Sequence, residues 1–135
     1  MYQQQRIRFG FGGGITPAVK LLLIANGVVF ILQNLAPEFF HSWLALWPYL
    51  AWRKLNVWQL VTYMFLHGGF MHLLFNMFAL WMFGGPIARL VGQARFDRNY
   101  SPTGRAAGLT HVIFLPTSMV PVIGASGATD GILLA

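Results

Sequence analysis

The feature that most constrains this chain is a run from Val57 to Gly85 that carries no formal charge. Over the whole chain only 9% of residues are charged, whereas a soluble domain averages about 25%. This deficit indicates that lipid, rather than water, surrounds much of the fold. The sequence therefore predicts an all-α, polytopic helical membrane protein.

Two apolar segments predict membrane-spanning helices. Val19 to Ala36 approaches the minimum of about 17 residues for a crossing, and we interpret it as a retained helix rather than a signal peptide. Val57 to Phe83 is long enough to span at a tilt. Residues 37–56 are rich in tryptophan, which concentrates at headgroup level. They predict a half-submerged loop, with Trp43 and Trp47 on one face if that piece is helical; a soluble amphipathic hairpin is the alternative.

The basic residues predict the orientation in the membrane. Seven of the nine lie before the first apolar run, at its cytoplasmic end or after the second run, on the side that we assign to the cytoplasm: Arg6, Arg8, Lys20, Arg89, Arg95, Arg98 and Arg105. Residues 1–18 then form a cytoplasmic tail and residues 19–135 a membrane domain. The net charge of +6 forms no patch within polar sequence, so we expect no nucleic-acid partner.

The last third of the chain has weaker signals. Asp97 to Arg105 is polar and rich in turn-forming residues. Ala106 to Leu115 is apolar but too short to span alone, and whether it crosses the membrane stays open. Prolines 116 and 121 then indicate a loop. Gly124 to Ala135 predicts the beginning of another membrane helix, with Asp130 inside it.

Two polar side chains inside the second apolar run are candidate functional residues. His72 and Asn76 are four apart, so they share one face of a helix. Polar groups inside a membrane are costly, and their N–H donors suit an oxyanion. The alternative is interhelical hydrogen bonding. His67 is expected to be structural. Because His67 and His72 are not at the i,i+4 spacing of helical zinc pairs, we expect no metal site.

A short glycine-rich motif, Gly124-Ala-Ser126-Gly127, follows near the C-terminus. Glycines permit a tight turn and close approach by a substrate. A serine at a helix N-terminus also has free backbone N–H groups nearby, which favours a nucleophile beside an oxyanion site. The alternative is a cluster of small residues that only packs helices together.

Together these motifs resemble the membrane core of the rhomboid intramembrane serine proteases. The resemblance is densest from Trp58 to Gly84 and resumes at Val122–Ala128 and Gly131–Ala135, within an overall match from Val19 to Ala135. It implies a rhomboid-like six-helix bundle, of which this chain would supply about three to four helices and end within the fourth. It also implies a first loop that is partly embedded in the membrane.

The resemblance assigns roles to the motif residues. Ser126 would be the nucleophile, His72 and Asn76 would stabilise the oxyanion with the Ser126 backbone N–H, and Gly124 and Gly127 would shape the turn. The family cleaves transmembrane segments of other membrane proteins and needs no cofactor. The implied partners are such substrates and the lipid bilayer, and the implied location is a bacterial inner membrane with a cytoplasmic N-terminus.

Three features depart from the family pattern. Its general base is a histidine of the sixth helix, and no histidine here has that position, so we expect the chain as given to be inactive, as a truncated chain or a decaying copy. Asp97, Arg98 and Arg105 fall in a helix that is apolar in the family, at about 3 kcal/mol each near the bilayer centre. Asp130 follows the nucleophile closely. A non-catalytic binder of client transmembrane helices is the alternative function, and an unrelated small helical membrane protein is a third.

Overall fold

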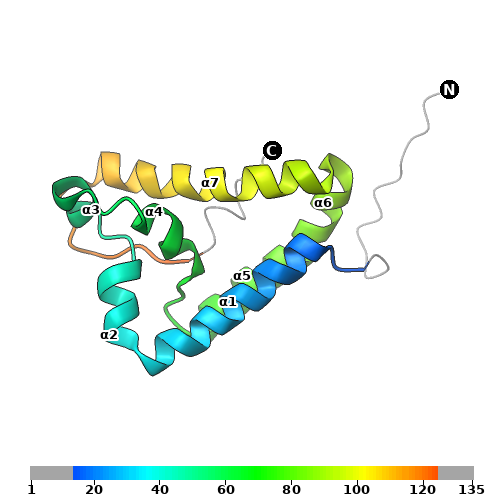
Figure 1. Ribbon diagram of the computed structural model, residues 1–135, viewed down its shortest axis with the longest axis horizontal. Helices are drawn as coiled ribbons and strands as arrows, with labels where there is room; N and C mark the ends of the chain where they lie inside the picture. The colour runs from blue at the N-terminus through cyan, green and yellow to red at the C-terminus, as the bar shows by residue number, and fades with distance from the viewer. Residues whose placement is uncertain (1–13, 125–135) are drawn as a thin grey trace.

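The computed structural model describes residues 14–124, and within them the chain is helical apart from short connections (Figure 1). In chain order the elements are α1 (Pro17–Leu35), α2 (Pro37–Phe39), the π-helical turn η1 (Phe40–Leu44), α3 (Pro48–Lys54), α4 (Gln59–Thr62), the 3-10 turn η2 (Tyr63–Phe65), α5 (Phe70–Ala79), the π-helical turn η3 (Leu80–Gly84), α6 (Gly85–Val91) and α7 (Gln93–Phe114). The predicted all-α class is confirmed.

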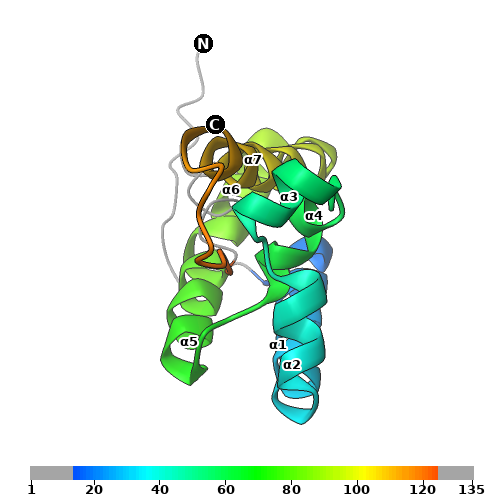
Figure 2. The same cartoon turned by 90° about the vertical axis from the view of Figure 1, so that its left-hand side faces the viewer.

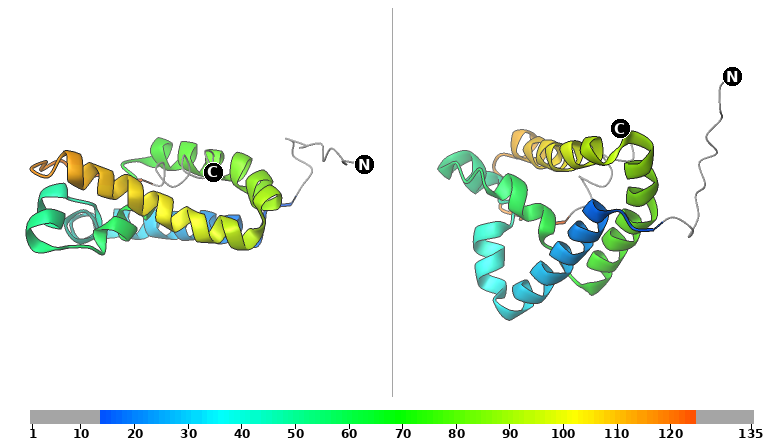
Figure 3. Two further views of the ribbon diagram at one scale, coloured as in Figure 1. Left: turned by 90° about the horizontal axis from the view of Figure 1, so that it is seen from above. Right: turned by 45° about the vertical axis from the view of Figure 1, so that its right-hand side comes forward.

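Within residues 14–124, two helical segments are long and apolar enough to cross a membrane. They are α1, with a mean hydropathy of 1.8, and the continuous stretch of α5, η3 and α6 from Phe70 to Val91, with 1.4. The two segments lie side by side and are in contact (Figures 1 and 3). At Gly84 an added Cβ would lie 3.0 Å from Cγ2 of Val19, so this glycine allows the helices to approach closely. The first predicted helix, Val19–Ala36, is confirmed: α1 begins two residues earlier and ends one residue earlier.

The prediction of one helix from Val57 to Phe83 is wrong at both ends. The chain leaves helical geometry after η2, with Leu66 extended, and α5 begins only at Phe70. Uncharged composition does not distinguish a continuous helix from two pieces joined at Gly68-Gly69. At the other end the helical stretch continues to Val91 through the π-helical turn η3, and Pro86 lies directly after that turn.

The tryptophan-rich segment between the two spans is folded into short helices rather than an open loop. The side chain of Gln59 accepts from the backbone N–H of Trp47, and the Thr62 hydroxyl donates to the carbonyl of Leu44. The indole of Trp58 donates to the carbonyl of Trp43. Trp43 and Trp47 do not share a helical face, because η1 ends at Leu44 and Trp47 is extended. These contacts tie α4 to this segment, which explains why α4 is separate from α5.

The polar stretch from Asp97 to Arg105 is helical, not a turn, and it forms the first half of α7. Buried residues recur at every fourth position along this helix: Phe96, Tyr100, Gly104, Gly108 and Val112. That stripe packs against α3, α4 and α6, and α7 runs from α6 back to α3 (Figures 1 and 3). Tertiary packing therefore overrides the turn propensity of this sequence, including Pro102. The apolar stretch Ala106–Leu115 is the second half of the same helix.

The packing of α7 predicts a sensitive position at Gly108. A Cβ there would lie 2.9 Å from Cε1 of Tyr63 and 3.0 Å from Cδ2 of Leu46. We expect Gly108→Ala to lower the free energy of unfolding by about 1–3 kcal/mol, because the added methyl group would overpack the core. Thermal unfolding of the purified protein in detergent checks this. Gly27→Ala is the matched control, since nothing lies within 4 Å of a Cβ there. Equal unfolding midpoints for the two variants would contradict the packing.

Candidate active site

His72 and Asn76 lie one turn apart on α5, as their spacing predicted. Asn76 is buried and His72 is half-buried. The amide of Asn76 donates to the carbonyl of His72 at 3.0 Å, which leaves its second N–H available for another acceptor. Both side chains therefore present donors near the beginning of the second span.

The structure brings Gly124 against both of these side chains. A Cβ built on Gly124 would lie 2.9 Å from Cε1 and Nε2 of His72 and 3.9 Å from Nδ2 of Asn76. Gly124 also has a φ of +114°, a backbone conformation that other residues rarely adopt. Only glycine fits this position, because any side chain would be strained and would collide with the imidazole.

Three long-range contacts hold Gly124 in place. Its N–H donates to the carbonyl of Tyr63 at 2.9 Å. Just before it, Val122 and Leu46 exchange backbone hydrogen bonds of 2.7 and 3.1 Å in an antiparallel bridge. The Tyr63 hydroxyl donates to the carbonyl of Gly104 on α7 at 2.6 Å. The segment that follows α7 therefore returns across the molecule toward α5 (Figure 2).

The hydrogen bonds of His72 determine which ring nitrogen carries the proton. The backbone N–H of Gly68 donates to Nδ1 of His72 at 3.2 Å. Since Nδ1 is the acceptor, a neutral imidazole carries its proton on Nε2, the nitrogen beside Gly124. Nε2 of His72 and Nδ2 of Asn76 thus both lie near the Gly124 backbone, 2.9 and 3.9 Å from a Cβ built there. Preorganised donors of this kind, from histidine and asparagine side chains, can stabilise an oxyanion.

The ring of His67 packs against the imidazole of His72. The His67 ring is fully buried and packs edge-on against the His72 ring, with centroids 5.1 Å apart and an interplanar angle of 69°. Burial and, secondly, the neighbouring His72 lower the pKa of His67 to about 4. The side chain of Gln33 on α1 binds the backbone N–H and carbonyl of His67. Burial therefore favours the uncharged form of His67, and its contacts with Gln33 and His72 agree with the structural role expected from the sequence.

Two residues of this site were not identified from the sequence as site residues. Gln33 is a polar residue in an apolar helix, and its partner lies 34 positions away in the sequence. Tyr63 gave no signal, although its carbonyl and hydroxyl bind Gly124 and Gly104. Ser126, Gly127 and Asp130 lie outside the described residues. Within residues 14–124, no three His, Asp or Glu side chains form a cluster that could hold a metal ion.

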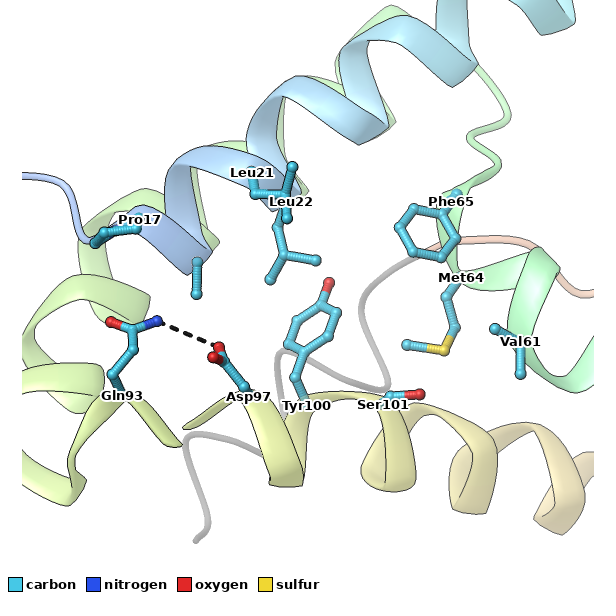
Figure 4. Close-up of a pocket in the computed structure, with 11 residues that line it drawn as sticks. Pro17, Leu21, Leu22, Val61, Met64, Phe65, Gln93, Asp97, Tyr100 and Ser101 are labelled. Atoms are coloured by element: carbon cyan, nitrogen blue, oxygen red, sulfur yellow. Dashed lines mark hydrogen bonds between the residues drawn. The ribbon is translucent and has the colours of Figure 1, made fainter. Parts of the chain in front are cut away.

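A separate cavity of about 440 Å³ lies between the beginning of α1, the α4–η2 region and α7 (Figure 4). Its lining is mostly apolar, and the ring of Tyr100 points into it. At one edge Gln93 donates to Asp97 at 3.2 Å. None of its lining residues is His72, Asn76 or Gly124.

The charged groups Asp97, Arg98 and Arg105 are exposed on α7, so none of them occupies the protein interior.

The sequence model of the Rhomboid domain matches residues 54–135, which include both helix donors and the glycine-rich motif. The chain belongs to the rhomboid family. It is similar to a putative rhomboid protease, YdcA of Bacillus subtilis, with 39% identity over 75 residues, covering 56% of this chain and 37% of that relative. As the resemblance implied, the chain is a rhomboid-like helical membrane protein.

Two further relatives are named rhomboid protease GlpG. The protein of Klebsiella pneumoniae is 37% identical and that of Yersinia pestis 34% identical, each over 84 residues, 62% of this chain and 29% of the relative. The chain therefore matches about a third of the length of these curated rhomboid relatives.

The low pKa of His67 predicts that stability falls in acid. Between about pH 6.5 and pH 4 the unfolded chain binds a proton at His67 that the folded chain does not. The free energy of unfolding therefore rises with pH across this window. We expect the thermal midpoint to drop between pH 7 and pH 4.5, and to drop less in His67→Phe.

The matched control for this measurement is His111→Phe, because His111 is exposed on α7. It should retain the full loss of stability in acid. An equal loss in the His67 and His111 variants would show that His67 is not the group that titrates.

Proposed function

We propose that this chain carries the oxyanion site and the nucleophile of an intramembrane serine endopeptidase that cleaves transmembrane segments of other membrane proteins. One observation carries the proposal: the backbone of Gly124 lies against Nε2 of His72 and the amide of Asn76. A nucleophile that follows Gly124 would attack a carbonyl whose oxygen is within reach of these two donors. The names of the rhomboid relatives agree with this chemistry.

Ser126 is the proposed nucleophile. It follows Gly124 by two residues, and covalent geometry limits the distance between their Cα atoms to about 7.6 Å. The Ser126 oxygen would bond to the scissile carbonyl carbon, and the oxyanion would accept from His72, Asn76 and the Ser126 N–H. Collapse would expel the amine with a proton and leave an acyl-enzyme, which water would hydrolyse. Gly127 would keep the backbone accessible beside Ser126.

The mechanism needs a base that removes the proton from the Ser126 hydroxyl. The described histidines do not provide it near Gly124, because the ring of His67 is fully buried against His72 and Nδ1 of His72 already accepts from Gly68. The rhomboid resemblance implies a histidine of the sixth helix. The proposal therefore requires a base other than the described histidines.

The proposed orientation places the active site near the side of the membrane opposite the basic residues. Residues 1–18 would be a cytoplasmic tail, and residues 19–135 would lie in a bacterial inner membrane. The exposed side chains of Trp43, Trp52 and Trp58 around the first loop suit the opposite headgroup region. Substrates would reach the site as helices within the bilayer.

Substitution of the proposed nucleophile tests the function. In proteoliposomes that contain the full-length gene product and a substrate with one transmembrane helix, Ser126→Ala should abolish cleavage. Asn76→Ala should reduce kcat by about 100-fold, because one oxyanion donor is lost. Ser101→Ala, on α7, is the matched serine control and should cleave normally.

Two results would overturn the protease assignment. Normal cleavage by Ser126→Ala would remove the nucleophile. If the wild-type protein crosslinks to client helices but yields no product, the function is non-catalytic binding of those helices.

A further inference from the structure

Gln33 makes a two-point contact with the segment that leads into the second span. It lies in the last turns of α1 and is buried, with 6% of its surface exposed. Its side-chain oxygen accepts from the N–H of His67 at 3.1 Å, and its amide donates to the carbonyl of His67. A single side chain therefore satisfies both backbone groups of a residue that is not in a helix.

The carbonyl of His67 and the N–H of Gly68 belong to the same peptide group, which is planar. Gln33 binds the carbonyl end of this plane, and the N–H end donates to Nδ1 of His72 at 3.2 Å. Rotation of the peptide would break both hydrogen bonds at once. The orientation of the Gly68 N–H is thus coupled to a side chain on α1.

Donation from Gly68 to Nδ1 is also what keeps the proton of a neutral His72 on Nε2. If that donor turned away, Nδ1 could carry the proton, and Nε2 would become an acceptor facing Gly124. An acceptor there would repel a developing oxyanion instead of stabilising it. The His72 ring also packs on the buried His67 ring, so the same segment fixes its plane.

We propose that Gln33 is a positioning residue: it holds the His67–Gly68 peptide so that His72 keeps its proton on Nε2 and directs it at the Gly124 backbone. The expected effect of Gln33 on catalysis rests on the proposed protease function, whereas its expected effect on which nitrogen of His72 carries the proton does not. The side chain of Gln33 forms its hydrogen bonds with the backbone of His67, so its effect on the candidate site passes through the His67–Gly68 peptide and the imidazole of His72.

The neighbouring amide provides a matched control. Asn34 is exposed, and its side chain donates to the carbonyl of Phe30 within its own helix. Gln33→Met keeps a side chain of similar length but removes both hydrogen bonds to His67. Asn34→Met makes the same chemical change one residue away and leaves the hydrogen bonds between Gln33 and His67 unchanged.

The direct test is 15N NMR of the full-length protein labelled with 15N-histidine, with the His72 signals assigned by their loss in His72→Gln. At neutral pH the wild type and Asn34→Met should show a protonated Nε2 and an unprotonated Nδ1. Gln33→Met should show a mixture of both tautomers. A wild-type His72 protonated on Nδ1 would overturn the proposal even if Gln33→Met does not fold.

The second readout is kinetic. Gln33→Met should lower kcat about 10-fold with KM unchanged, a loss at the lower end of the roughly 10–100-fold effect of removing a partner that orients a metal-binding histidine. Unchanged kcat and an unchanged tautomer in Gln33→Met would overturn the proposal and leave the protease assignment intact. An inactive wild type would overturn the protease assignment, while the tautomer comparison still decides the role of Gln33.

Discussion

The rest of this structure depends on the interruption of helical structure between η2 and α5. A segment that leaves helical geometry beside membrane helices exposes N–H and carbonyl groups that lipid cannot satisfy. Here Gln33 binds the backbone of His67, Gly124 donates to the carbonyl of Tyr63, and Gly68 donates to His72. The same contacts that satisfy these groups assemble the candidate active site.

The outer elements stabilise this arrangement through Tyr63. Its ring packs against Gly108, and its hydroxyl binds the carbonyl of Gly104, so α7 is fixed against the segment before the interruption. The bridge between Leu46 and Val122 joins the first loop to the chain that returns from α7. Gly124 is therefore positioned by parts of the sequence that are far apart, rather than by its own local motif.

The sequence predicted the features that depend on local periodicity or composition. The first span and the shared face of His72 and Asn76 follow from apolar length and helical spacing. The interruption before α5 did not, because an uncharged run has the same composition whether or not it is one helix. The local pattern did not predict the helical conformation of α7, which only the family resemblance implied, because turn-forming residues concealed a buried stripe. The partner of Gln33 depends on tertiary contact, which no local pattern encodes.

The central claim is that the Gly124 backbone lies against the imidazole of His72, where a Cβ would be 2.9 Å from Nε2. The most direct measurement is solid-state NMR dipolar recoupling between 13Cα of Gly124 and 15Nε2 of His72, in protein reconstituted in lipid. We predict a measurable coupling, because Cα of Gly124 is one bond of about 1.5 Å from the Cβ position that lies 2.9 Å from Nε2. The absence of coupling, with both signals observed and assigned, would contradict the account.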